Sequence, residues 1–378
     1  MLTYADLVQL ERQTRDQTVL SVYLNGEGAD SITRSRWQAD LRHSLDDVAT
    51  WLRDASHEER EDFGARRRLL EERVETFRGE IGAPGWVAFL DTSGVRHESA
   101  VHGPVPTMAV WSTGACVAPY IRALKESRPV VIAVVDSRHA RLYRYVDHDV
   151  ELVERLEADL DFEVPGSMSR PAAQGFHTGT RGQTGTDAAR DVLQKEMDRM
   201  LTTARARIES LAGDDGWIVV GGIPTVVNAA MSRLSQALQS RAMQADLDVN
   251  ATTAQVTACA RESASRLRNT HDLARIREII AAAEANGVGV IGGGDTMRAL
   301  DEGRARNLYF TLRHLEANAS ELEAAVRSAF DHGTGVEHVS GEAAEVLDGV
   351  GGIAAGLRYV PSAAANPESG SGATARAS

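Results

Sequence analysis

Apolar and polar positions alternate along this chain with two different periods. Short runs of mostly apolar residues, of the length of a buried strand, occur at residues 18–24, 86–90, 130–135 and 217–222. Between them lie longer segments in which apolar residues recur at spacings of three and four, the period of an amphipathic helix. The clearest of these contains Leu193, Met197, Met200, Ala204, Ile208 and Leu211. Strands that alternate with helices predict an α/β fold of mixed α+β character.

The order of these segments predicts three consecutive α/β domains. Residues 1–126 form the first domain, residues 127–247 the second and residues 248–361 the third. After Pro361 the composition changes to Ser, Ala, Gly, Asn and Thr. A segment with so few apolar residues cannot bury a core, so residues 362–378 are expected to be a disordered tail.

Residues 161–186 of the middle domain show no apolar periodicity and are rich in Gly, Ser and Thr. A loop of this length inside a compact chain is uncommon, and such loops tend to be functional or disordered. Its glycines allow close backbone approach, Arg181 can pair with a phosphate, and the Gln183 amide can orient a water or a ribose hydroxyl. A flexible surface loop is the alternative interpretation. A long helix follows, with Thr186 or Asp187 placed to cap its start.

Motifs for the common cofactors are absent from the sequence or lie in the wrong context. Residues 287–292 spell G-x-G-x-x-G, but these glycines lie within a predicted strand instead of the turn that follows one. The sequence has no P-loop, and its cysteines, Cys116 and Cys259, are isolated. No cluster of His and carboxylate residues has the spacing of metal ligands. We therefore expect neither a metal nor an organic cofactor.

Composition and charge narrow the choice of partners. Asp and Glu number 54 against 41 Lys and Arg, a formal net charge of −13. This balance argues against indiscriminate coating of nucleic acid, so DNA is not an expected partner and any RNA contact must be local. No apolar run approaches the roughly 18 residues of a membrane helix. Because the N-terminus does not look like a signal peptide and the cysteines are few, a cytoplasmic protein is expected.

Three strings of the sequence, taken in order, resemble one family. The first is the predicted strand pair of residues 130–145, the loop with Gly179-Thr180-Arg181-Gly182-Gln183 and the helix of residues 187–211. The second is GVIGGGDTMRALDEGRARNL at residues 289–308, and the third is GGIAAGLRY at residues 351–359. Together they resemble the bacterial branch of the archaeo-eukaryotic class-I peptide-chain release factor and Pelota superfamily, which includes the Balon-like ribosome hibernation factors.

The resemblance implies a release-factor-like fold with a long loop in the middle domain and the ribosome as partner. In that family the loop carries a Gly-Gly-Gln tripeptide to the peptidyl-transferase centre. This implies contacts with ribosomal RNA in the A site from Gly179, Thr180, Arg181, Gly182, Gln183, Gly185 and Thr186. It also implies that elongation factor Tu or a related GTPase can act as a partner.

Two departures from the family pattern bear on function. The Asn-Ile-Lys-Ser decoding tetrapeptide has no counterpart between Arg34 and Gly79, so stop-codon reading by that route is not expected. The catalytic tripeptide is degenerate in either register. If Gln183 matches the family's Gln, Arg181 stands in place of the first Gly. If the helix start fixes the register, Gly185 matches the second Gly and Thr186 replaces the Gln.

Three functional hypotheses follow. The first is a non-decoding factor that occupies the A site, blocks translation and protects idle ribosomes. The second is a rescue enzyme that hydrolyses peptidyl-tRNA on stalled ribosomes, in which Gln183 positions the water and Gly182 allows close approach. The third is an adaptor or stress protein that keeps the fold and has lost the ribosome, which suits the net charge of −13.

Overall fold

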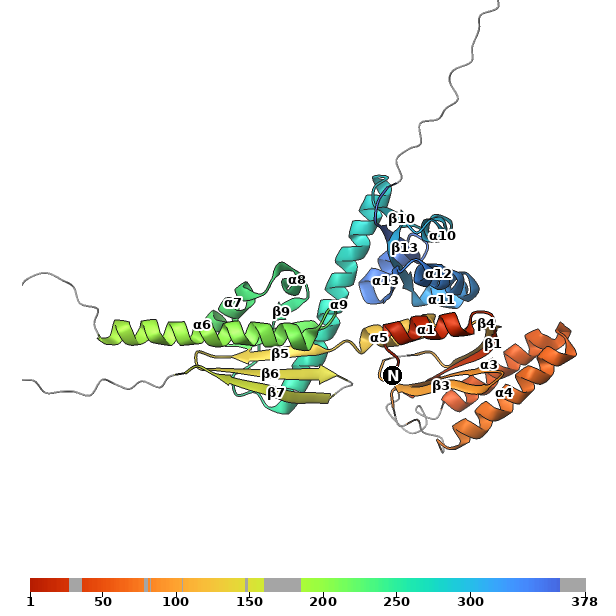
Figure 1. Cartoon of the computed structure of the whole chain (residues 1–378), viewed down its shortest axis with the longest axis horizontal. Helices are drawn as coiled ribbons and strands as arrows, with labels where there is room; N and C mark the ends of the chain where they lie inside the picture. The colour runs from red at the N-terminus through yellow and green to blue at the C-terminus, as the bar shows by residue number, and fades with distance from the viewer. Residues whose placement is uncertain are drawn as a thin grey trace, which may run out of the picture. The chain divides into compact units, whose positions relative to one another are not determined.

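The computed structural model describes residues 1–26, 36–77, 81, 83–103, 105–146, 149–159 and 185–360. Contacts between Cα atoms divide the chain into two compact units, whose helices and strands are labelled in Figure 1. Unit 1 combines Met1–Lys125 with Asp272–Ser378, and unit 2 is Glu126–His271. The expected tail, residues 362–378, and most of the long loop, residues 160–184, lie outside the described residues.

The first sheet of unit 1 has the strand order β3-β2-β1-β4 and is antiparallel throughout. Its central strands are buried on both faces, because alternate side chains point to opposite faces and helices cover each. Leu20 and Leu24 pack with α3 and α4, whereas Val19 and Tyr23 pack with α1 and α5. These elements are α1 (Tyr4–Thr14), β1 (Thr18–Asn25), α3 (Trp37–Trp51), η1 (Leu52–Asp54), α4 (His57–Glu75), β2 (Gly85–Asp91), β3 (Gly94–Val101), β4 (Met108–Thr113) and α5 (Ala118–Glu126).

The second sheet of unit 1 has the strand order β10-β13-β11-β12, with β11 and β12 parallel and β13 antiparallel to both of its neighbours. Gly292 is the N-cap of the helix after β10, and its φ of 80° is a conformation that glycine adopts without strain. These elements are β10 (Gly289–Ile291), α10 (Gly293–Asp301), β11 (Ala305–Thr311), α11 (Leu312–Ala317), α12 (Ala319–Asp331), β12 (Gly335–Val339), α13 (Gly341–Asp348) and β13 (Ile353–Leu357).

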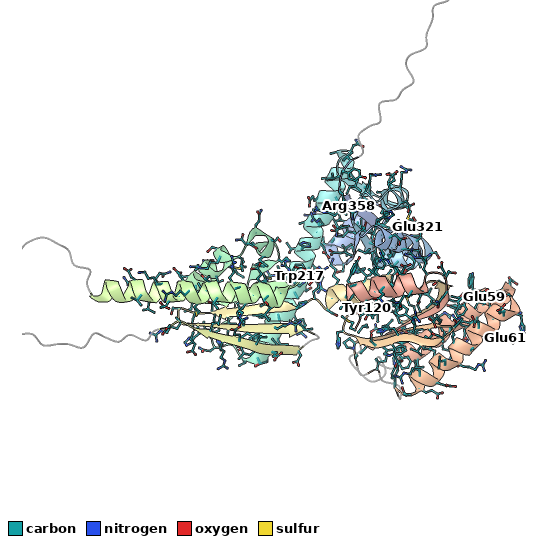
Figure 2. The ribbon with its side chains drawn as sticks, viewed as in Figure 1. Glu59, Glu61, Tyr120, Trp217, Glu321 and Arg358 are labelled. Carbon is teal, nitrogen blue, oxygen red and sulfur yellow. The ribbon has the colours of Figure 1, made fainter. Side chains whose placement is uncertain are left out.

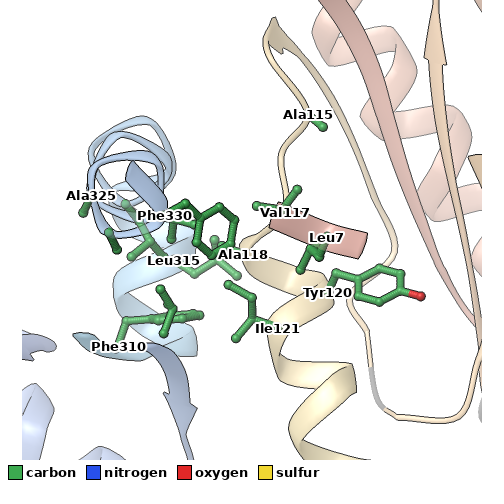
Figure 3. Packing of buried hydrophobic residues seen from close by; sticks show 14 of the residues in the cluster. Leu7, Ala115, Val117, Ala118, Tyr120, Ile121, Phe310, Leu315, Ala325 and Phe330 are labelled. Carbon is green, nitrogen blue, oxygen red and sulfur yellow. The ribbon is translucent and has the colours of Figure 1, made fainter. Parts of the chain in front are cut away.

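One hydrophobic core joins the two sequence-distant parts of unit 1. Leu7 of α1 and Ile121 of α5 belong to the same buried cluster as Phe310 of β11, Leu315 of α11 and Phe330 of α12 (Figure 3). Burial of apolar surface contributes about 25 cal/mol per Å², so each part stabilises the other. The division into three domains stays a prediction, and the structure adds that the first and last segments pack together.

Unit 2 is built on one mixed sheet of order β7-β6-β5-β8-β9. β5, β6 and β7 form an antiparallel meander, and β5, β8 and β9 are parallel. Leu142 packs with α6 and α7 on one face, and Tyr143 packs with α9 on the other. Trp217 of β8, labelled in Figure 2, meets His271 of α9 edge to face, with 5.7 Å between the ring centres. The elements are β5 (Val130–Val135), β6 (His139–Val146), β7 (Asp149–Glu157), α6 (Gly185–Ala212), β8 (Trp217–Gly222), α7 (Pro224–Arg233), α8 (Gln236–Gln239), β9 (Ala242–Gln244) and α9 (Thr253–Glu284). Of α9, the residues from Asp272 onward belong to unit 1.

The mixed α/β class predicted from the sequence is confirmed, since helices flank each of the sheets. The apolar runs at 18–24, 86–90, 130–135 and 217–222 are strands β1, β2, β5 and β8. Strands β3 and β7 have no such run, because much of their surface is exposed and carries polar residues. No helix in the described ranges is long and apolar enough to span a bilayer.

Candidate functional site

The loop predicted to carry the function is only partly within the described structure. Gly185 and Thr186 are the first residues of α6, but their side chains are not described. The remaining predicted site residues lie outside the described ranges; these are Gly179, Thr180, Arg181, Gly182 and Gln183. The structure therefore defines the frame that holds the loop, which consists of β7 on one side and α6 on the other.

The loop leaves unit 2 from one edge of the sheet. β5 and β8 are parallel, and β7 runs in the same direction because it is two antiparallel steps from β5. All three strands therefore end at the same edge, and the loop begins directly after β7 there. In sheets with parallel strands, ligands bind beyond the carboxyl ends of the strands. The predicted loop starts in the region where this kind of fold places its functional residues.

The β5–β6 turn fixes the start of the loop at this edge. Asp136 Oδ1 accepts hydrogen bonds from the backbone N–H groups of Arg138 (2.7 Å) and His139 (2.8 Å). The His139 ring Nδ1 lies 3.2 Å from Asp136 Oδ2. Burial alone would raise the pKa of Asp136, but these hydrogen bonds outweigh it and hold the pKa below its usual range. The Arg138 carbonyl in turn accepts from the N–H of Ala158 (2.7 Å), so the turn anchors the chain just before the loop.

The end of β8 closes tightly against the end of β5. Gly222 has a φ of 121°, and a Cβ atom there would overlap the carbonyl oxygen of Val135. The next residue, Ile223, donates its N–H to the same carbonyl at 3.0 Å. Only glycine fits this position. At this end of the sheet the backbones of β5 and β8 are therefore in direct contact, with no room for a side chain at residue 222.

Helix α6 holds the other end of the loop. Its apolar stripe, predicted from the spacing of three and four, is confirmed by the burial of Met200, Leu201, Ala204 and Ile208 against the sheet. The N-terminal turns of α6 extend past the strands of unit 2 (Figure 1). Over the exposed stretch before Met200, the side chains from Arg190 to Gln194 are mostly open to solvent. The helix is a packed stem with a free end at which the loop finishes.

Three of the cations of α6 lie in ion pairs. Arg199, Arg205 and Arg207 each pair with a glutamate of the same unit. Surface pairs of this kind contribute little stability but cancel local charge. These three pairs reduce the positive charge of α6, whose exposed stretch also carries Arg190 and Lys195.

The Arg66-Arg67-Arg68 cluster of α4 is also not a free basic patch. Arg66 is buried, with its guanidinium 4.6 Å from the centre of the Trp111 ring and a hydrogen bond to the Thr18 carbonyl. Arg67 pairs with carboxylates of α3 and α4. Arg66 also forms an ion pair with Asp62, one turn earlier in α4. The aromatic ring, the carbonyl and this carboxylate together satisfy the buried cation.

A separate cavity of about 240 Å³ lies within unit 1, beside Cys116 and Glu323. Glu323 accepts hydrogen bonds from the Cys116 thiol (3.1 Å) and from the N–H groups of Val117 (3.2 Å) and Ala118 (2.9 Å). It thereby caps the N-terminus of α5 from another helix. Burial raises the pKa of both Glu323 and Cys116. A thiol that keeps its proton is a poor nucleophile, so we assign this cavity no chemistry.

The part of the chain that the structure describes contains no group of three or more His, Cys, Asp or Glu able to hold a metal ion. The candidate site is therefore the loop and the sheet edge that anchors it. Sequence reasoning missed the anchoring role of Asp136. The sequence indicates this role only by an aspartate directly after a strand, where its carboxylate can accept hydrogen bonds from the backbone N–H groups of the following turn.

Comparison with known proteins adds a family match over this part of the chain. Residues 116–265 match the family model described as bacterial archaeo-eukaryotic release factor family 10. The matched segment contains the sheet of unit 2, the predicted loop and α6. No curated protein sequence matches the chain.

Several solved structures are similar in part, at low identity. Dom34 of S. cerevisiae, described as interacting with Hbs1, is 12% identical with a TM-score of 0.44, over 63% of this chain and 65% of Dom34. An archaeal translation termination factor, aRF1, is 15% identical with a TM-score of 0.27, over 95% of this chain and 99% of the aRF1 chain. A model of ribosome-bound archaeal Pelota with ABCE1 is 14% identical with a TM-score of 0.41, over 95% of this chain and 94% of the other.

Proposed function

Because residues 116–265 match the model of a bacterial archaeo-eukaryotic release factor family, we propose that this chain is a ribosome-binding factor that occupies the A site without reading a stop codon. Its role in this proposal is to block translation and protect idle ribosomes, as in Balon-like hibernation factors. The family match over the loop-bearing unit carries the proposal. The missing decoding tetrapeptide separates it from a termination factor.

The frame around the loop suits this role. Helix α6 has 28 residues, a length of about 42 Å, and among its described side chains those buried against the sheet begin at Met200. The loop can therefore enter a narrow site while the sheet stays outside it. A loop that fills the acceptor end of the A site excludes an aminoacyl-tRNA by volume alone, so blocking requires no catalytic residue.

Hydrolysis of peptidyl-tRNA is the second candidate function, because the dipeptide Gly182-Gln183 is present in the loop sequence. In this alternative the Gln183 amide orients the attacking water and Gly182 allows close approach to the ester. Arg181 counts against it, since a charged side chain stands where the family has a flexible glycine.

The proposal is tested by competition for the A site. Purified chain is added to ribosomes that carry peptidyl-tRNA, and the binding of labelled aminoacyl-tRNA is followed together with release of the peptide. We expect loss of aminoacyl-tRNA binding, no peptide release, and the same result for Gln183→Ala. Gln194→Ala, an exposed glutamine of α6, is the matched control. Release that Gln183→Ala abolishes and Gln194→Ala retains would establish the rescue enzyme instead.

Two further parts of the proposal rest on the family resemblance. Elongation factor Tu or a related GTPase is the proposed delivery partner, and the cytoplasm, where ribosomes work, is the proposed location. Delivery by a GTPase predicts that association with ribosomes accelerates when the factor and GTP are added together. An association rate that does not change would remove the GTPase from the account.

A further inference from the structure

Two arginines stand directly opposite each other on neighbouring strands of unit 2. In the antiparallel pairing of β6 with β7, Arg141 is the partner of Arg155. Residues so paired have Cβ atoms about 4.5–5.5 Å apart and point to the same face. That face is the one covered in part by α9, because the neighbours of Arg141, Ala140 and Leu142, pack in the core with α6 on the other face.

Folding gives no reason for this arrangement. Like charges directly opposite in an antiparallel sheet are destabilising, and Arg141 is half-buried, which weakens solvent screening. Within the described ranges neither guanidinium has a hydrogen bond or an ion pair. The nearest carboxylate in the register is Glu157, which lies opposite His139 and therefore diagonal to Arg141. The pair costs stability in the free chain, so an anionic ligand is the simplest reason for its presence.

A third cation lies on the same face. Tyr145 of β6 is on this face and packs in the same core as α9. Burial raises the pKa of Tyr145, and the positive charge of Arg261 of α9 opposes that shift. Arg261 is exposed, and no carboxylate pairs with it in the part of the chain that the structure describes. This face therefore carries three arginines without an ion pair in the part of the chain that the structure describes, with Glu157 as a neighbouring carboxylate.

The opposite face shows that this is not a general property of the sheet. There Arg144 stands opposite Glu151 in the register, and Arg207 of α6 pairs with Glu154 of β7 at 3.1 Å. Cations on the α6 face have acidic neighbours, whereas Arg141 and Arg155 have each other. The asymmetry selects the α9 face as the one that meets an anionic partner.

We propose that Arg141 and Arg155 bind the phosphate backbone of RNA, which rests on the ribosomal role proposed above. Guanidinium groups recognise phosphate oxygens through paired N–H donors. The chain as a whole carries a charge of −13, so it repels RNA except where positive charge is concentrated. Phosphate contacts of this kind set orientation and register on RNA without reading sequence. The pair would thus align unit 2 on ribosomal RNA while the loop enters the A site.

The test uses the full chain and the double variant Arg141→Ala/Arg155→Ala. We expect its dissociation constant for ribosomes to rise on the order of tenfold, and the slope of log affinity against log salt to fall by about 2. Its melting temperature should equal or exceed that of the wild type, because a repulsive pair is removed. Arg144→Ala is the matched control and should leave affinity and slope unchanged. Arg141→Lys/Arg155→Lys should restore the salt slope, since the charge is kept.

The outcomes separate this inference from the proposed function. If wild type and double variant bind ribosomes equally, with equal salt slopes, the phosphate site is wrong and the ribosomal role stands. If the wild type does not bind ribosomes, the ribosomal role fails, and fluorescein-labelled oligouridine then tests the site alone. Tighter binding to polyglutamate than to oligouridine would identify an acidic protein as the partner and overturn the RNA proposal.

Discussion

A buried ion cluster marks both points at which the chain passes between the two units. Lys125 is the last residue of the first part of unit 1, and Asp272 is the first residue of the second part. Lys125 Nζ lies 2.7 and 2.9 Å from the Asp272 carboxylate oxygens, 2.8 Å from the His338 carbonyl and 3.0 Å from Glu337 Oε2. The side chains of Lys125 and Asp272 are 4% and 1% exposed.

Replacing Lys125 by Met should destabilise unit 1 strongly. The substitution keeps the length of the side chain but removes the charge that balances Asp272, which cannot turn toward water. Breaking one partner of a buried ion pair costs about 3–5 kcal/mol. For a unit of this size the loss lowers the melting temperature on the order of 10 °C. Urea denaturation followed by tryptophan fluorescence measures the free energy, since Trp86 and Trp111 lie in the cores of unit 1.

The double variant Lys125→Met/Asp272→Leu is the control for this reasoning. Replacing both members of a buried pair by apolar side chains is often neutral or stabilising, so the double variant should recover the part of the lost stability that is due to Asp272. Glu337, whose side chain is 18% exposed, keeps its charge in both variants. Two results would refute the argument: a single variant within 1 kcal/mol of the wild type, as for an exposed pair, or a double variant as unstable as the single.

Two further predictions concern single positions. Gly222→Ala should cost about 3 kcal/mol or more, because the new Cβ meets the Val135 carbonyl oxygen at a φ of 121°; thermal unfolding measures this loss, and an unchanged melting temperature would contradict it. Burial raises the pKa of Glu323, which means that the folded protein favours the protonated side chain. The contribution of Glu323 to the free energy of unfolding is therefore complete below the ordinary glutamate pKa of about 4.3, and it is lost as pH rises through the raised pKa. The stability of the wild type relative to Glu323→Gln should therefore fall with rising pH, and a pH-independent difference would contradict the assignment.

The strongest elements could be predicted because their burial is nearly complete. β1, β5 and β8 consist almost wholly of buried residues, so their apolar runs stand out in the sequence. β7 alternates exposed and half-buried positions, and its charged residues conceal the strand. The core shared by α1, α5, α11 and α12 was beyond sequence reasoning, since an amphipathic helix shows which of its faces is buried but not what covers that face.

One part of the candidate site could be predicted from the sequence, and another part could not. The Gly-rich loop at residues 161–186 is visible from composition alone, and the family match covers it. The opposition of Arg141 and Arg155 depends on register, which a β-bulge between the pairs of Leu142 and Tyr143 shifts by one residue. No periodicity in the sequence reports such a shift, so this pair could be recognised only in the folded sheet.

The central claim is that the chain binds the ribosome and leaves peptidyl-tRNA intact. It is tested most directly by co-sedimentation with ribosomes that carry labelled peptidyl-tRNA, with bound chain and released peptide read from one sample. The account predicts that the chain pellets with the ribosomes and that the label stays on the tRNA. Absence of the chain from the pellet at low salt would contradict it, and pelleting with release of the label would make the chain a rescue hydrolase.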